Sequence, residues 1–212
     1  MDVVAVGMLD PSQVPGGLDR YRVDLDCALR ARGHQVAEIC AAPEPVGLGQ
    51  YRVGGPLAII WGARRAVAHV LAQRGRRWSL VAAHFALPAA GVLSLPLAAR
   101  LPWVVHFHGP WADEARVESG SRPGPLPLDA RAQLERLVYL RARAVITLSS
   151  AFARVATERY GVATQRVHVI PPGVDLTRFS PGDRTSARQR LGLGPHMRVF
   201  LTVRRLAAWS SL

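Results

Sequence analysis

Short apolar runs alternate with amphipathic stretches along most of this chain, and this alternation restricts the possible folds more than any other feature. The first run, Val3–Leu9, is apolar nearly throughout, as is typical of a strand buried on both faces. In the next segment Leu18, Tyr21 and Leu25 recur at helical spacing. Gly33 then stands where a helix ends. Strands that alternate with helices imply parallel β-α-β units, so we expect an α/β fold with a Rossmann-like, doubly wound, mostly parallel sheet.

The same alternation predicts the strands and helices of the rest of the chain. The strands expected to share this sheet are Val3–Leu9, His34–Cys40, Leu80–His84, Trp103–His106, Val145–Leu148 and Val167–Ile170. Further helices are expected over Ile59–Arg74, Ala89–Arg100 (interrupted near Pro96), Leu128–Arg143, Ser149 or Ser150 to about Arg159, and Thr185–Leu191. The Pro- and Gly-rich stretch Ala41–Pro56 is expected to be a loop, and Val199–Val203 a final strand.

The run Pro171-Pro172-Gly173 ends this alternation of strands and helices, because proline and glycine interrupt regular secondary structure. We therefore expect one domain over residues 1–172. Residues 173–212 would form a short C-terminal segment beyond it, and within this segment we expect Thr185–Leu212 to pack poorly.

The chain carries a formal net charge of +12, and all 27 of its basic side chains are arginine. Such a charge favours phosphates, anionic lipids or nucleic acid as partners. The arginines are scattered along helices and form no basic run interleaved with aromatic residues, so we expect no nucleic-acid binding. Contact with an anionic membrane surface stays possible.

The two cysteines have no metal-site or disulfide spacing, and no basic segment precedes the first apolar run. Both observations favour a reduced, cytoplasmic location, and the positive charge is compatible with a peripheral position at the inner membrane. Leu80–Ala99 is long enough to span a membrane and lacks charged residues. Its prolines, its histidine and its alanine-rich composition favour a buried strand followed by a packed helix.

In a doubly wound sheet, ligands bind outside the carboxyl ends of the strands. The loop after the first strand, Asp10–Gly17, ends on Gly16-Gly17 directly before a helix. Paired glycines there allow a phosphate or sugar to approach the backbone, and the helix start favours an anion. A glycine pair that only turns the chain is an equal alternative. A P-loop is excluded because its lysine is missing.

The second candidate site is His106-Phe107-His108-Gly109, at the end of a later strand. One histidine would be structural and the other would contact a substrate hydroxyl, and His84 could face the same cleft. A metal pair lacks a third ligand, so we expect no metal and no cofactor. Asp113 follows on a loop and could line the site. Asp24 and Asp26 resemble a metal-binding Asp-x-Asp pair, but they lie mid-helix and are interpreted as surface charge.

Several motifs together resemble the glycosyltransferases of family 4. They are Pro15-Gly16-Gly17-Leu18-Asp19-Arg20-Tyr21, Arg32-Gly33-His34-Gln35-Val36, His84-Phe85-Ala86-Leu87-Pro88, Phe107-His108-Gly109-Pro110-Trp111-Ala112, Val145-Ile146-Thr147-Leu148-Ser149, and Val169-Ile170-Pro171-Pro172-Gly173-Val174-Asp175 with Arg178-Phe179 and Pro181. They occur in the family's order over nearly the whole chain.

This resemblance implies the N-terminal half of a GT-B fold, followed by a hinge and the start of a donor domain. It implies a retaining, metal-independent transfer of a hexosyl unit from a nucleotide-diphosphate sugar to a sugar or lipid acceptor. Residues 1–172 would hold mainly the acceptor, with Gly16-Gly17 near the donor diphosphate and His108 at the transferred sugar. Arg205 resembles the arginine of the donor domain that contacts the diphosphate.

The family's next basic residue and its acidic sugar-binding motif do not follow in this sequence. We therefore expect a truncated donor domain and no transfer by this chain alone. The alternative is a non-catalytic module that binds a sugar, a lipid headgroup or a protein.

Overall fold

The structure is a computed structural model of the chain, and it describes residues 1–14, 16–113 and 127–202. It divides into a compact unit, Met1–Pro171, and a second unit, Pro172–Leu212. The division lies one residue from the boundary expected from the sequence. That the second unit begins a donor domain stays a prediction.

The first unit alternates strands and helices along the chain. Its strands are β1 (Asp2–Leu9), β2 (Gln35–Ala42), β3 (Gln50–Arg52), β4 (Trp78–Ala83), β5 (Trp103–Phe107), β6 (Ala144–Thr147) and β7 (Val167–Val169). Its α-helices are α1 (Gly17–Ala31), α2 (Pro56–Leu71), α3 (Ala86–Leu93), α4 (Pro96–Ala99), α6 (Leu128–Arg141) and α7 (Ser150–Arg154). A π-helical turn, Val155–Arg159, extends α7, and a 3-10 turn, Thr164–Arg166, precedes β7. The second unit contains α8 (Arg184–Arg190).

All seven strands form one parallel sheet in the order β3-β2-β1-β4-β5-β6-β7. From β1 the chain first builds outward through β2 to β3, and then returns to β4 and builds toward β7. The direction therefore reverses between β1 and β4. In such sheets the carboxyl ends of the strands at this reversal form the ligand-binding crevice. The expected doubly wound parallel sheet is confirmed.

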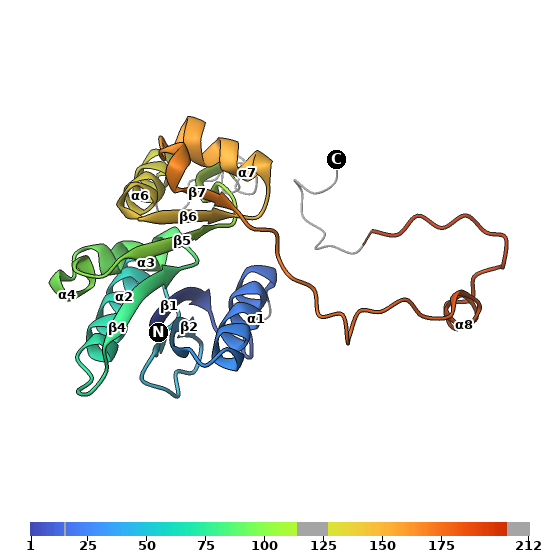
Figure 1. Cartoon of the computed structure of the whole chain (residues 1–212), viewed down its shortest axis with the longest axis horizontal. Helices are drawn as coiled ribbons and strands as arrows, with labels where there is room; N and C mark the ends of the chain where they lie inside the picture. Colours follow the sequence, from blue (N-terminus) through green and yellow to red (C-terminus); the bar gives the residue numbers. More distant parts are fainter. Residues whose placement is uncertain (15, 114–126, 203–212) are drawn as a thin grey trace. The chain divides into compact units, whose positions relative to one another are not determined.

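Helices cover both faces of the sheet. Helix α3 packs against both α2 and α6 in one layer, whereas α1 packs against β1 and β2. Figure 1 shows α1 on the side of these strands opposite α2. This separation follows from right-handed crossovers, because the chain moves in one direction after α1 and in the other after α2.

Side chains of β1 alternate between these two layers. Val4 and Val6 belong to the main apolar core with Val67 of α2, and all three are fully buried. Gly7 faces α1 instead, where a Cβ would overlap the side chain of Arg22. The α1 face of the sheet is thus built around a buried charged residue.

Arg22 is fully buried and donates hydrogen bonds to Asp26 (3.0 Å) and Glu38 (2.8 Å). This network joins α1 to β2. Asp26 is only 1% exposed, so its interpretation as surface charge is wrong. Burial raises the pKa of Asp26 to about 6, although Arg22 opposes the shift. Asp24 lies two residues earlier and is exposed, because residues two apart on a helix point to different faces. It pairs with Arg20 in solvent.

Several expected helix ends are confirmed. Ser149 caps α7 and accepts a hydrogen bond from the Phe152 amide (3.3 Å). Gly33 follows the end of α1 with φ of +81°, a conformation that glycine adopts without strain. Pro96 begins α4 and so separates it from α3.

Three expectations are wrong. The stretch Ala41–Pro56 is not entirely a loop, because β3 pairs with β2 within it. The helix expected from Ile59 to Arg74 starts earlier and ends earlier, since Pro56 suits the first helical turn. Residues 199–202 form no strand, and Val203 lies outside the described residues. An apolar run becomes a strand only where a partner strand accepts its backbone hydrogen bonds.

No helix among the described residues is long and apolar enough to cross a membrane. Leu80–Ala99, which has the length of a span, is instead divided among β4, α3 and α4.

We predict that Arg22→Met lowers the free energy of unfolding by about 3–5 kcal/mol, because it leaves Asp26 buried without its cation. Urea denaturation would measure this. Arg20→Met is the matched control, since Arg20 makes an ion pair of the same i,i+4 spacing in solvent. The urea midpoint of this control variant should equal that of the wild type. Equal midpoints for both variants would contradict a structural role for the buried network.

Candidate functional site

Five of the residues expected to bind ligand follow carboxyl ends of strands near the reversal of the sheet. Gly16 and Gly17 follow β1, at the start of α1. His84 directly follows β4, and His108 and Gly109 follow β5. The parallel topology therefore brings these segments, far apart in sequence, to one edge of the sheet.

Neither glycine of the pair is required by the free protein. Gly16 is the N-cap residue of α1 in an extended conformation (φ −158°), and Gly17 is the first helical residue. A Cβ at Gly17 would meet no atom within 4 Å, and one at Gly16 would only touch Asp19. The simple turn-glycine alternative thus has no support in the backbone. Moreover, the N-cap residue Gly16 has no side chain that could cap the first turn of α1, so the amides of this turn can donate hydrogen bonds to an anion.

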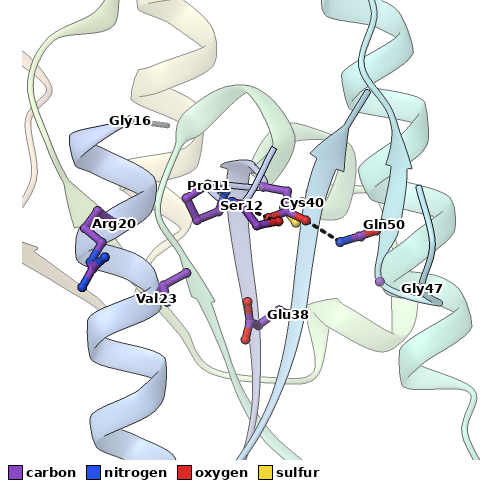
Figure 2. Close-up of a pocket in the computed structure, with 11 residues that line it drawn as sticks. Pro11, Ser12, Gly16, Arg20, Val23, Glu38, Cys40, Gly47 and Gln50 are labelled. Carbon is purple, nitrogen blue, oxygen red and sulfur yellow. Dashed lines mark hydrogen bonds between the residues drawn. The ribbon is translucent and has the colours of Figure 1, made fainter. Parts of the chain in front are cut away.

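Gly16 lines a cavity of about 790 Å³ between α1, the loop after β1 and the β2–β3 connection (Figure 2). Its polar lining includes Asp10, Ser12, Glu38 and Gln50. Asp10 accepts hydrogen bonds from the Ser12 hydroxyl (2.7 Å) and the Gln50 side-chain amide (2.7 Å), which fixes the rim of the cavity. A wall of this kind suits a ligand with several hydroxyl groups.

Cys40 also lines this cavity, where burial raises the pKa of its thiol to about 12. The thiolate is therefore scarce at neutral pH, and Cys40 is not suited to act as a nucleophile.

Asp19 fixes the start of α1 against the end of β1. Its carboxylate accepts hydrogen bonds from the backbone amides of Met8 (3.2 Å) and Leu9 (3.1 Å). Sequence analysis assigned Asp19 no role of its own. An acidic residue in the first turn of a helix is the signal that could have identified it.

His84, His106 and His108 form a column of imidazoles, in which His84 and His106 are buried and His108 is half-buried. The rings of His84 and His106 are stacked with centroids 4.1 Å apart, and those of His84 and His108 are 5.9 Å apart. Tyr21 of α1 packs against all three, and its hydroxyl lies 3.1 Å from His106 Nδ1. The column thus couples the first turns of α1 to the end of β5.

Burial keeps the column uncharged near neutral pH. Desolvation lowers the pKa of His106 to about 3 and that of His108 to about 4, and it lowers the pKa of His84 well below its usual value. Both ring nitrogens of His84 and Nε2 of His108 lack a hydrogen-bond partner within the described ranges. Neutral His108 can therefore donate or accept one hydrogen bond with a ligand hydroxyl.

Glu135 of α6 supports the loop after β5. It is fully buried and accepts hydrogen bonds from the amides of Trp111 (2.9 Å) and Ala112 (3.2 Å) and from the Tyr160 hydroxyl (2.9 Å). It lines a small cavity of about 30 Å³ together with Leu18, His84, His106, His108 and Gly109. Sequence analysis missed Glu135, because nothing in its local pattern distinguishes it from a surface residue of α6.

Two other expected residues were Asp113 and Arg205. Asp113 lines neither cavity described above, and its carboxylate accepts hydrogen bonds from Arg159 in an ion pair. Arg205 lies outside the described residues. Gly109 has a φ of 139°, which favours glycine and explains its place after His108. Across the described ranges no group of three or more His, Cys, Asp or Glu side chains could hold a metal ion.

The column predicts a loss of stability in acid. Each histidine has a lower pKa in the folded than in the unfolded protein, so below pH 6.5 the unfolded state binds more protons and is favoured. At pH 5 one such histidine costs about 2 kcal/mol. Urea denaturation at a series of pH values between 7 and 5 gives the free energy of unfolding as a function of pH. The slope of this curve should correspond to about one bound proton fewer in His106→Asn than in the wild type. Parallel curves would contradict this prediction.

Comparison with solved structures supports the fold. Sucrose-phosphate synthase from Thermosynechococcus elongatus superposes with a TM-score of 0.69 at 20% identity, over 91% of this chain and 53% of that one. Anabaena HepE in complex with UDP-glucose gives a TM-score of 0.57 at 22% identity, over 91% and 50%. These GT-B neighbours confirm the expected fold class, and the match covers about half of each of them.

Curated relatives match over shorter stretches. The D-inositol 3-phosphate glycosyltransferase of Geodermatophilus obscurus is 41% identical over 92 residues, 43% of this chain and 20% of that protein. Its counterpart in Rhodococcus erythropolis is 32% identical over 130 residues, 61% of this chain and 24% of that protein. These matches thus span about a fifth to a quarter of the relatives' length.

The family model of Glycosyltransferase Family 4 matches residues 15–178. That match includes the Gly16-Gly17 loop, the histidine column and most of the parallel sheet. The resemblance expected from the motifs is confirmed, and this chain belongs to Glycosyltransferase Family 4.

Proposed function

We propose that this chain supplies the acceptor-side half of a retaining glycosyltransferase. The full enzyme would transfer a hexosyl unit from a nucleotide-diphosphate sugar to a sugar or lipid acceptor. The family match over residues 15–178 carries the proposal. Two solved neighbours support a nucleotide-linked donor: HepE was solved with UDP-glucose, and the starch synthase IV catalytic domain of Arabidopsis thaliana with ADP and acarbose.

In this proposal the start of α1 receives the donor diphosphate. The uncapped amides of its first turn and the absence of a Cβ at Gly16 and Gly17 suit the approach of an anion. Asp19 and the contact between Tyr21 and His106 hold this turn in place. Fixed amides lose little entropy when the anion binds, and they can stabilise the charge that develops on the leaving diphosphate.

His108 would contact the transferred sugar. Its Nε2 atom is buried and lacks a partner among the described residues, so a sugar hydroxyl would satisfy it. Its low pKa keeps the imidazole neutral, so it would orient the sugar without placing a positive charge beside an oxocarbenium-like centre. Glu135 and Gly109 would position the loop that carries it.

The cavity of about 790 Å³ would receive the acceptor. Asp10, Glu38 and Gln50 offer oxygens that accept hydrogen bonds from hydroxyl groups, which favours a polyhydroxylated acceptor. Asp113 and Arg205 keep their expected roles only as proposals.

Transfer requires the donor and acceptor to be held together away from water. Since the chain matches about half of its solved GT-B neighbours, we propose that it does not transfer sugar by itself.

The substitution Gly17→Ala tests whether a ligand approaches this backbone amide, and it should do so without affecting folding. The structure leaves room for this Cβ, so the thermal midpoint should not fall. In a fusion of this chain to a family donor domain, the methyl group should obstruct the diphosphate and lower kcat/KM by roughly 10-fold or more, as loss of a charge-assisted hydrogen bond would. Gly194→Ala, in an equally open position of the second unit, is the matched control. Unchanged turnover in Gly17→Ala would contradict a role for this amide.

The second experiment tests the reaction itself. The purified chain and the donor-domain fusion are incubated with a panel of nucleotide-sugars and with sugar and lipid acceptors. We expect turnover only in the fusion, and His108→Ala should lower it by roughly 100-fold. His168→Ala, which alters an exposed histidine of β7, should leave turnover unchanged. Robust transfer by the unfused chain would overturn the half-enzyme proposal, and an inactive, folded fusion would favour the non-catalytic module.

A further inference from the structure

Helix α2 exposes large apolar side chains on its outer side. Its inner side is buried in the core through Ile59, Ala63 and Val67. On the outer side Leu57 is 67% exposed and Trp61 is 57% exposed. These two residues are four apart, so they lie next to each other on one face of the helix. An exposed leucine and tryptophan side by side mark a surface that contacts something other than water.

Arginines adjoin this apolar pair. The Arg64 guanidinium lies 5.8 Å from the centre of the Trp61 ring, and Arg65 follows Trp61 by one helical turn. Arg65 also lines a shallow groove of about 460 Å³ beside the β2–β3 connection, together with Arg52 and Leu48. Leu48 is itself 65% exposed. We define the α2 surface as these six residues: Leu48, Arg52, Leu57, Trp61, Arg64 and Arg65.

The segment that forms the α2 surface carries charge of one sign. Between Glu44 and Asp113 the sequence contains no acidic residue. The same interval contains seven arginines, namely Arg52, Arg64, Arg65, Arg74, Arg76, Arg77 and Arg100. Helices α2, α3 and α4 are thus built entirely from a segment that carries only positive or neutral side chains. A partner that covers this surface should therefore be anionic.

We propose that the α2 surface docks the protein on an anionic lipid bilayer. Trp and Leu side chains favour the boundary between headgroups and acyl chains, and flanking arginines pair with lipid phosphates while their stems cover apolar area. Helix α2 would lie in the plane of the membrane with Leu57 and Trp61 inserted. Nucleic-acid phosphates would satisfy the arginines but would leave Leu57 in water, so the lipid surface matches more of the site. This proposal does not depend on the proposed transfer reaction.

Vesicle co-sedimentation of the full 212-residue chain tests the proposal. We expect binding to vesicles that mix phosphatidylcholine with phosphatidylglycerol, weak binding to phosphatidylcholine alone, and a decrease as salt is raised. Arg52→Gln with Arg65→Gln should weaken the binding by roughly 30-fold, since each arginine near an anionic surface contributes about fivefold. Leu57→Ser with Trp61→Ser should weaken it by at least roughly tenfold and should also remove the residual binding at high salt.

A charge-matched control excludes a general effect of net charge. Arg32→Gln with Arg143→Gln removes two exposed arginines outside the α2 surface and should change binding by less than twofold. Circular dichroism and urea midpoints verify that each variant is folded. The proposal is overturned if the wild type does not bind anionic vesicles, or if both arginine pairs weaken binding equally. It is also overturned if the α2 surface variants lose only RNA binding or self-association in sedimentation equilibrium.

Discussion

The parallel pairing of β1 with both β2 and β4 is the constraint on which the rest of the unit depends. It places the start of the chain at the centre of the sheet and makes the strand order reverse beside it. Because every strand runs in the same direction, the loops after β1, β4 and β5 emerge at one edge. The Gly16-Gly17 turn, His84 and His108 share that edge only through this pairing, although they are far apart in sequence.

The sequence predicted most of the sheet because six of its strands are short, nearly continuous apolar runs. It missed β3, whose three residues Gln50-Tyr51-Arg52 carry a single apolar side chain. That strand exists because Tyr51 packs closely against Gly62 of α2, which is a tertiary contact and leaves no periodic pattern. Val199–Thr202 is the converse case, because it is an apolar run that pairs with none of the described strands and therefore forms no strand.

The position of a residue at the candidate site was predictable where it belongs to a loop motif, as at Gly16 and His108, whose roles in binding stay a prediction. The position was not predictable where it depends on which face of a helix meets a loop. Glu135 is such a case, because only the fold shows that its carboxylate points at the amides of Trp111 and Ala112. Asp26 is another: the rule that residues two apart point to different faces was correct, but one of those faces is buried. Helical spacing identifies faces without saying which of them the sheet will cover.

The contact between Gly7 and Arg22 restricts which substitutions this sequence can accept during evolution. A side chain cannot arise at position 7 while the guanidinium of Arg22 occupies the space beneath it. Loss of Arg22, in turn, leaves the carboxylate of Asp26 buried without its hydrogen-bonded cation, whereas Glu38 keeps its ion pair with Arg30. Gly7, Arg22 and Asp26 therefore form a coupled set, and descendants of this chain should either keep all three or replace them together. Covariation among them, rather than invariance of any single one, is the expected evolutionary signature of the buried ion network.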